Sequence, residues 1–238
     1  MVGMSIAAST SARGTVVLAV KSLSDAKSRL TPLPKDADRP ALVSAMLIDT
    51  LDAVAAVGAD AVVVSPDPDV LRLVADRGAM PVDEPEPITG LSPLNAALAH
   101  GALPVGRTAY LQADLPALRP ASLAAALDDG ARALTRAPAS FVADRSGHGT
   151  VLLVATAGFT PRFGIDSAHR HRDACAVELD PEHRHWADLR TDIDTPDDLA
   201  VAARLGLGPR TRAALARHTA DADRFDRTAR RGCGTMNR

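Results

Sequence analysis

Cysteine and aromatic side chains are scarce in this sequence. Its 238 residues include two cysteines, one tryptophan, one tyrosine and four phenylalanines. The two thiols, Cys175 and Cys233, cannot build the disulfide framework that stabilises small secreted domains. Residues 1–14 have no apolar core of the kind that a signal peptide carries. We therefore expect a cytoplasmic protein whose thiols stay reduced.

The sequence also lacks a dominant charge. Lysine and arginine number 27 against 29 aspartates and glutamates, for a formal net charge of -2. The basic residues are dispersed, which excludes the concentrated positive face of a nucleic-acid-binding domain. No apolar run reaches the length that crosses a membrane. We expect neither a nucleic acid nor a membrane as partner, and any phosphate binding must depend on local charge.

Hydrophobic residues make up 46% of the sequence, enough for a sizeable core. Short apolar runs alternate with segments of helical spacing, which predicts an α/β fold with a mostly parallel central sheet flanked by helices. The predicted strands are 15–20, 61–64, 79–82, a run from 108 that ends at 114, 140–143, 151–155 and 176–179. We expect one domain over residues 15–208, a disordered lead-in over 1–14, and a short helix with a disordered basic tail over 209–238.

Glycine is missing from the loop that follows the first predicted strand. This loop carries Lys21, Lys27 and Arg29 but no Gly-rich phosphate-binding signature, so a Walker-type ATPase is disfavoured. In open α/β folds, the loop after the first strand often holds a nucleotide phosphate. The loop is thus either a triphosphate site or a solvated basic loop.

Asp114 ends the predicted buried strand that begins at Thr108, and Pro116 then prevents the ladder from continuing. Ligands bind open α/β sheets at the carboxyl ends of their strands. Asp114 is therefore a candidate for a ligand site, and the alternative is an aspartate that caps the next helix or turn.

A second acidic stretch contains Asp192 and Asp194. In an extended segment, residues two apart lie on one face, close enough to share a hard cation such as Mg²⁺. Thr195 and Pro196 then begin a helix as N-cap and first residue, so both acids precede the cap. Dipole complementation explains acids inside the first turn, whereas Asp192 and Asp194 need another explanation.

Asn95 follows a helix start made by Ser92 and Pro93. Its amide could read the edge of a base, or it could be an ordinary asparagine on a helix face. Residues 144–150 form a glycine-containing link between two predicted strands, in which Thr150 either donates its hydroxyl to a ligand or ends a plain β-turn.

Gly164 and Ser167 precede a short polar helix over 169–172. The N–H groups at its start could hold a phosphate or carboxylate, or the histidine and arginine run could be a solvated face. His169 and His171 are two residues apart on a helix and point in different directions, so we exclude a zinc site here.

Taken together and in order, these motifs resemble the guanylyltransferases of coenzyme F-420 biosynthesis. The resemblance covers Thr15 to about Leu207. The motifs are Ala19-Val-Lys21 with Ala26-Lys27-Ser-Arg29-Leu, Met46-Leu-Ile-Asp49-Thr, Pro93-Leu-Asn95, Gln112-Ala-Asp114-Leu-Pro116-Ala, Ser140-Phe-Val-Ala-Asp144-Arg, Gly149-Thr150, Arg162-Phe-Gly164 with Asp166-Ser167, and Asp192-Ile-Asp194-Thr-Pro196.

The resemblance implies a glycosyltransferase-A-like nucleotidyltransferase fold, similar to nucleotide-diphospho-sugar transferases. It implies transfer of GMP from GTP to a small phosphorylated three-carbon acid, with release of pyrophosphate. The implied acid-binding residues are Thr150, Gly164 and Ser167, and the implied Mg²⁺ ligands are Asp114, Asp192 and Asp194. Lys27 is the implied triphosphate-binding residue, with Lys21 and Arg29 as further nucleotide-binding candidates, and Asn95 is a candidate from its place at the helix start. Lys27 and Asp114 are the candidate catalytic residues.

The identity of the acid remains open between phosphoenolpyruvate, 2-phospho-L-lactate and 3-phosphoglycerate. The closer resemblance to actinobacterial members favours phosphoenolpyruvate. A transferase that consumes the labile product is a candidate partner. Related nucleotidyltransferases that act on a molybdenum cofactor or a sugar phosphate usually have a Gly-rich first loop, which is missing here. The alternative from another class is a non-catalytic GTP-binding scaffold, which would not need the three acids and Lys27.

Overall fold

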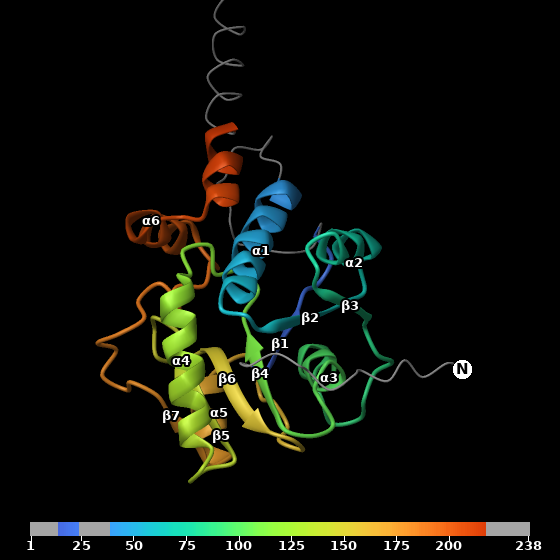
Figure 1. Cartoon of the computed structure of the whole chain (residues 1–238), viewed down its shortest axis with the longest axis vertical. Coiled ribbons are helices and arrows are strands. Elements are labelled where there is room, and N and C mark those ends of the chain that lie inside the picture. The colour runs from blue at the N-terminus through green and yellow to red at the C-terminus, as the bar shows by residue number, and fades with distance from the viewer. Residues whose placement is uncertain (1–13, 24–38, 218–238) are drawn as a thin grey trace, which may run out of the picture.

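The computed structural model describes residues 14–23 and 39–217, and the predictions for Lys27, Arg29 and Cys233 lie outside these residues. Its centre is a seven-stranded sheet with the strand order β3-β2-β1-β4-β6-β5-β7 (Figure 1). The strands are β1 (Thr15–Ala19), β2 (Asp60–Ser65), β3 (Met80–Asp83), β4 (Arg107–Leu111), β5 (Ala139–Ala143), β6 (Thr150–Thr156) and β7 (Ala176–Glu178). The helices are α1 (Arg39–Ala56), α2 (Pro68–Ala75), α3 (Pro93–His100), α4 (Pro120–Ala133), α5 (Ser167–Asp173) and α6 (Pro196–Leu205).

The sheet is mostly parallel, as the alternation of strands and helices predicts. β1 pairs in parallel with both β2 and β4, β2 with β3, and β5 with β7. β6 is antiparallel to both of its neighbours, β4 and β5. The carboxyl ends of the other strands therefore meet the start of β6 at one edge of the sheet.

Helices cover both faces of the sheet because the strands are apolar on both faces. In β4, Ala109 and Leu111 pack in one hydrophobic cluster with residues of α1, α2 and α4. Tyr110, between them, packs in a second cluster with residues of α3 and α5. Successive side chains of a strand point to opposite faces, so a run that is apolar throughout requires cover on both sides. The prediction of a buried strand before Asp114 is confirmed.

Three helices begin with a side-chain cap followed by proline, as predicted for two of them from the sequence. Ser92 Oγ accepts the Asn95 N–H before Pro93, and the Thr195 hydroxyl accepts the Asp198 N–H before Pro196. Asp67 caps α2 in the same way, one residue before Pro68. Proline is tolerated there because the first N–H groups of a helix have no partner within the helix.

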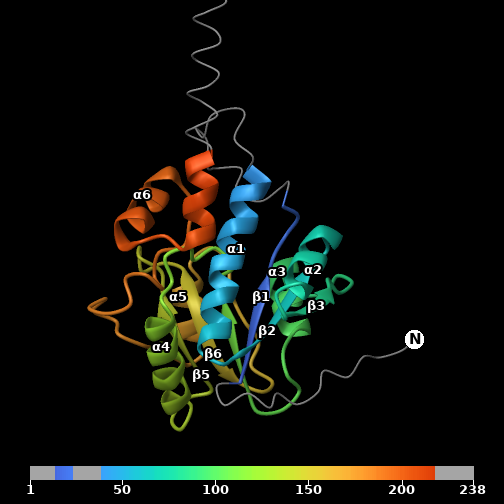
Figure 2. The same cartoon turned by 45° about the horizontal axis from the view of Figure 1, so that its top comes forward.

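A third layer covers the outer side of α1. A helix over residues 209–217 lies beside α1, with α6 on its other side (Figure 2), and both share a hydrophobic cluster with α1. The buried carboxylate of Asp49 on α1 accepts the N–H groups of Arg210 and Thr211, so it caps this last helix from a distance of more than 160 residues in sequence. Within the described ranges, no helix is both long and apolar enough to cross a bilayer.

Candidate active site

The first two predicted site residues follow neighbouring strands. Lys21 comes two residues after β1, and Asp114 comes three residues after β4, which pairs with β1 in parallel. Parallel neighbours end at the same edge of a sheet, so the two residues lie along one edge. Lys21 is exposed, and Asp114 is half-buried. This is the edge at which open α/β sheets bind their ligands.

Thr150 joins the same edge from the other direction because β6 starts there. Gln112 donates its backbone N–H to Val151 O, 2.9 Å away. Its side-chain amide approaches Thr150 O at 3.5 Å. The start of β6 thus lies beside the segment that leads into Asp114.

The Asp114 segment is held in place by Thr50 of α1. The Thr50 hydroxyl accepts the Leu115 N–H at 3.1 Å and donates to Met46 O at 3.0 Å. Both Thr50 and Leu115 are fully buried. This explains the motif Met46 to Thr50 physically: Asp49 caps the last helix, and Thr50 positions the neighbour of Asp114.

Asp192 and Asp194 flank a buried residue on an irregular segment. Ile193 is inaccessible to solvent and shares a hydrophobic cluster with Ala117, from the Asp114 loop. Asp192 is half-buried and Asp194 exposed, so the two acids point away from the core on either side of Ile193. The shared cluster draws the two acid-bearing segments toward one another.

The helix that follows fixes the backbone of Asp194. Asp198 Oδ2 accepts the N–H groups of Asp194 and Thr195 and the Thr195 hydroxyl, at 3.3, 2.9 and 2.8 Å. Its Oδ1 accepts from the Arg145 guanidinium. Burial alone would raise the pKa of Asp198, but the hydrogen bonds from Thr195 and Arg145 hold that pKa below its usual value. Asp198 thus stays an anion and orients the turn that carries Asp194.

The three predicted metal ligands are not assembled into a finished site. Three carboxylates are a donor set that suits a hard cation such as Mg²⁺. Among residues 14–23 and 39–217, however, no three acidic, histidine or cysteine side chains come together closely enough to hold a metal ion. The three carboxylates therefore suit Mg²⁺ chemically, but within the described residues they are not close enough to coordinate one ion. The magnesium site stays a prediction.

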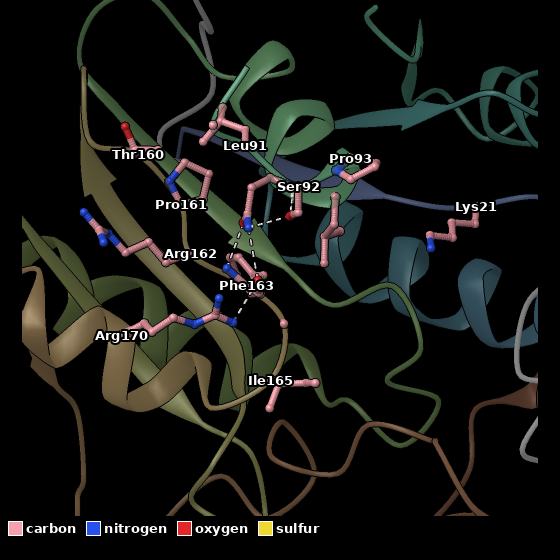
Figure 3. Close-up of a pocket in the computed structure, with 14 residues that line it drawn as sticks. Lys21, Leu91, Ser92, Pro93, Thr160, Pro161, Arg162, Phe163, Ile165 and Arg170 are labelled. Atoms are coloured by element: carbon pink, nitrogen blue, oxygen red, sulfur yellow. Dashed lines mark hydrogen bonds between the residues drawn. The ribbon is translucent and has the colours of Figure 1, made fainter. Parts of the chain in front are cut away.

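A pocket of about 620 Å³ lies beside this edge (Figure 3). It is lined by the start of α3, by residues 160–165, by Arg170 of α5 and by Lys21. Figure 3 shows Lys21 on one side of the pocket and Arg162 and Arg170 on the other. The structure thus places Lys21 and Gly164, which the sequence assigns to the nucleotide and to the acid, around one cavity.

Asn95 also lines the pocket, but its amide is bonded within the chain. Its Nδ2 donates to Ser92 Oγ at 2.8 Å and to Phe163 O at 3.1 Å, and its Oδ1 accepts the Phe163 N–H at 2.8 Å. The side chain is buried. In this arrangement Asn95 fastens residues 160–165 to α3, and its contact with a base stays a prediction.

Gly164 lines the pocket, and Ser167 begins α5 three residues later. Gly164 has a φ of 114°, and a Cβ there would lie 3.1 Å from the Arg170 guanidinium. A side chain at this position would be strained and would crowd that arginine. Ser167 is buried, and its N–H donates to Gly164 O at 3.1 Å.

His171 is a residue of the site that the sequence did not identify. From the sequence, His171 belonged to a polar run without a zinc site, which could be a solvated face. In the structure its side chain is fully buried. His169 is exposed, which confirms that the two histidines point in different directions. His171 Nδ1 lies 2.9 Å from Thr150 Oγ1. It therefore connects two predicted acid-binding segments, β6 and α5. The polar run 169–172 carries no local signal that His171 is buried.

Arg190 is the second residue that sequence reasoning missed. Its guanidinium is buried and donates to Ala143 O at 2.7 Å, to Asp180 O at 2.7 Å and to the Asp180 carboxylate at 3.0 Å. It thereby ties the end of β5 and the segment after β7 to the residues just before Asp192. The only available signal was a lone arginine in the motif Leu189 to Asp192.

Comparisons with known proteins identify the family of the chain. A family model described as "Guanylyl transferase CofC like" matches residues 14–230. The phosphoenolpyruvate guanylyltransferase of Mycobacterium sp. (strain KMS) is 47% identical over 214 residues, which cover 88% of this chain and 94% of that protein. The phosphoenolpyruvate guanylyltransferase of Salinispora arenicola (strain CNS-205) is 47% identical over 205 residues, covering 83% of this chain and 91% of that protein.

A solved structure supports the fold. The crystal structure of a protein from Desulfovibrio desulfuricans G20, described as a nucleotide-diphospho-sugar transferase, superposes with a TM-score of 0.61. The match covers 87% of this chain and 96% of that one, at 18% sequence identity. The predicted nucleotide-diphospho-sugar transferase-like fold is confirmed.

Proposed function

The chain belongs to the family of CofC-like guanylyl transferases, and we propose that it transfers GMP from GTP to phosphoenolpyruvate and releases pyrophosphate. The acid is proposed from relatives that carry this activity in their names and match over nearly their whole length. The observation within the molecule that supports the proposal is the pocket, which has Lys21 on one side and Arg162 and Arg170 on the other.

The reaction brings two anions together. An oxygen of the acid's phosphate attacks the α-phosphorus of GTP, the new P–O bond forms, and the bond to the β-phosphate oxygen breaks to release pyrophosphate. Near neutral pH a phosphate monoester is already largely ionised, so the attacking oxygen needs no general base. Catalysis can then come from positioning and from stabilisation of charge.

Cations of the chain lower the repulsion between the substrates. At a separation of about 4 Å, two unit charges near a protein surface repel by about 4 kcal/mol. Lys21 lines the pocket, and so do Arg162, Gly164 and Arg170. In this proposal Lys21 attracts the nucleotide, and the two arginines attract the acid.

Backbone groups and hydroxyls orient the acid. Gly164 allows the ligand to approach the main chain closely because it has no side chain. Thr150 begins β6 and Ser167 begins α5, and each carries a hydroxyl. These groups hold the phospho-acid so that one phosphate oxygen faces the nucleotide in line.

Asp114, Asp192 and Asp194 are the residues that would hold Mg²⁺. When bound, the ion neutralises phosphate charge and aligns the two substrates. We further propose that the product enters coenzyme F-420 biosynthesis and is consumed by a second transferase. In the product, a reactive phosphoanhydride bond joins GMP to the phosphate of the acid.

A substrate panel tests the proposed function. Phosphoenolpyruvate, 2-phospho-L-lactate and 3-phosphoglycerate are each incubated with each of the four common nucleoside triphosphates and Mg²⁺. We expect pyrophosphate release with GTP and phosphoenolpyruvate, and a product of the corresponding mass. GTP binding without turnover in any pairing would favour the non-catalytic scaffold instead.

A pair of aspartate variants tests the assignment of the site. Asp114→Asn should abolish turnover and leave the melting temperature unchanged, because the substitution removes a charge from a half-buried position at the edge. Asp76→Asn, on the exposed end of α2 away from the pocket, should retain full activity. Near-normal turnover of Asp114→Asn would contradict a role for this carboxylate.

A further inference from the structure

We propose that His171 is a positioning residue that makes the Thr150 hydroxyl a hydrogen-bond donor toward the phospho-acid. This inference rests on the proposed function for the identity of the acid, but not for the hydrogen-bond chain itself. The chain runs from the backbone of Arg162, through the imidazole of His171, to the side chain of Thr150.

The geometry of this chain is well defined. His171 is fully buried, and Thr150 is 2% exposed. The Arg162 backbone N–H donates to His171 Nε2 at 3.0 Å, and His171 Nδ1 lies 2.9 Å from Thr150 Oγ1. The rings of Phe141 and Phe163 pack against the imidazole, with centroids 5.8 and 5.3 Å away. These contacts hold the ring in one orientation.

The partners of His171 determine its tautomer. A backbone amide can only donate, so Nε2 must offer a lone pair and carry no hydrogen. A neutral imidazole has one N–H, which must then be on Nδ1. Nδ1 therefore donates to Thr150 Oγ1. A doubly protonated ring would place an N–H against the Arg162 N–H, which this arrangement excludes.

The charge state of His171 agrees with this assignment. Burial, with smaller contributions from the positive charges of Arg170 and Arg162, lowers the pKa of His171 to about 4. The imidazole is therefore neutral at neutral pH.

This tautomer determines the hydrogen-bonding role of the Thr150 hydroxyl. Its Oγ1 accepts the hydrogen bond from His171, so its own hydrogen must be donated elsewhere. Within the described parts of the chain, His171 is the hydrogen-bond partner of this hydroxyl. A phosphate or carboxylate has only acceptor oxygens, so a hydroxyl committed to donation matches either group of the phospho-acid. The tautomer of a buried histidine thus determines the polarity of a substrate contact.

The same hydrogen-bond chain links the segment of Arg162 to the start of β6. Arg162 belongs to the segment that lines the pocket, Thr150 begins β6, and His171 lies on α5. A ring fixed by both partners sets the distance between these segments. We expect its loss to weaken binding of the acid and to leave binding of GTP unchanged.

Two substitutions of His171 separate its two hydrogen bonds. In His171→Asn, the shorter amide reaches only the position of Nδ1, where its NH₂ group can still donate to Thr150. His171→Gln places its amide oxygen near the Nε2 position, where it accepts from Arg162 but leaves Thr150 without its donor. His169→Gln, on the exposed face of the same helix, is the matched control.

The expected results follow from the donor role of Thr150. Thr150→Val and His171→Gln should each raise KM for phosphoenolpyruvate about tenfold, the size of one lost hydrogen bond. His171→Asn should raise it less than about threefold, on the same scale. All variants should keep KM for GTP, and Thr150→Ser, which keeps the hydroxyl, should raise KM for phosphoenolpyruvate less than Thr150→Val does. The double variant Thr150→Val with His171→Gln should match the single ones, because both remove the same contact.

Additive effects in the double variant, or equal losses in the two His171 variants, would overturn the positioning role. Nitrogen NMR of histidine-labelled parent protein reads the tautomer without any turnover, and a hydrogen on Nε2 would overturn the inference even if the enzyme is active. Conversely, an Nδ1–H tautomer in a protein that turns over no pairing would refute the proposed function and the acid contact, while leaving the hydrogen-bond chain intact.

Discussion

The Arg145 guanidinium lies 2.5 Å from Oδ1 of Asp198, although the two residues are 53 positions apart in sequence. Arg145 belongs to the connection between β5 and β6, and Asp198 to the first turn of α6. The second oxygen of Asp198 accepts the N–H groups of Asp194 and Thr195. The backbone that carries Asp194 is therefore fixed to the sheet through one carboxylate.

Asp198→Asn should reduce both stability and turnover. The variant loses the anion that completes the capping box and pairs with Arg145, and loss of a cap typically costs about 1 kcal/mol. Turnover should fall further than stability accounts for, because Asp194 loses its backbone support. Denaturant unfolding and steady-state kinetics measure the two effects. Asp197→Asn, the exposed neighbour, is the control, and equal behaviour of the two variants would argue against this role.

Thr50→Val should leave the Leu115 N–H without its acceptor in a dry environment. An unsatisfied buried donor costs about 1–3 kcal/mol, and valine matches the shape of threonine. We also expect lower turnover, because Leu115 adjoins Asp114. Thr50→Ser keeps the hydroxyl and should retain most of the activity. Unfolding free energies and initial rates of both variants test this prediction. A Thr50→Val variant with unchanged stability and turnover would contradict it.

Arg190→Met should be among the most destabilising substitutions in the chain. It removes a buried guanidinium, which takes the Arg190 hydrogen bond from the Ala143 carbonyl and the arginine partner from the Asp180 carboxylate. Breaking a buried ion pair in this way costs about 3–5 kcal/mol. Arg184→Met, on an exposed arginine, should change the unfolding free energy little. Thermal and denaturant unfolding provide the comparison, and a loss below about 1 kcal/mol would count against the buried network.

His171 should make stability depend on pH in the acidic range. In the unfolded chain its pKa is near the ordinary value of about 6.5, and in the folded chain burial, Arg170 and Arg162 lower the pKa to about 4. Between these values the unfolded state binds a proton that the folded state does not. The free energy of unfolding should therefore fall as pH falls from about 6.5 to about 4, by about 3 kcal/mol in all.

His171→Asn should lose this contribution, and His169→Gln should keep it. Urea unfolding at several pH values between about 7 and 4.5 measures the slope of stability against pH. The charged groups that face the imidazole are Arg162 from the pocket wall and Arg170 from its own helix. Identical slopes in His171→Asn and in the parent protein would contradict the assignment.

Much of the architecture could be predicted from local pattern. The apolar run before Asp114 predicted a strand covered on both faces, and alternate residues of β4 do pack into two different clusters. Ser92 with Pro93 and Thr195 with Pro196 predicted two helix starts, because cap and proline act within one turn of chain. The order of strands and the antiparallel insertion of β6 between β4 and β5 needed the folded sheet.

The candidate site residues also differ in how far the sequence predicted them. Asp114 and Lys21 could be proposed as candidates because each follows a strand that local sequence marks, whereas Thr150 was proposed from the family resemblance. His171 and Arg190 were not identified, because their partners are distant in sequence: Thr150 lies 21 residues from His171, and Ala143 lies 47 residues from Arg190. A polar run such as 169–172 gives no sign that one of its histidines is buried.

The sequence by itself determined the α/β class, the helix starts and the strand ends that carry acids and cations, since these depend on interactions over a few residues. The tertiary structure alone decided which of those groups meet, and in which role. In the folded chain, the Asn95 side chain is hydrogen-bonded to the backbone of Phe163. The hydrogen bonds of His171 to Arg162 and Thr150 fix its tautomer. Hydrogen-bond polarity in a buried network depends on every partner, and those partners come together only when the chain is folded.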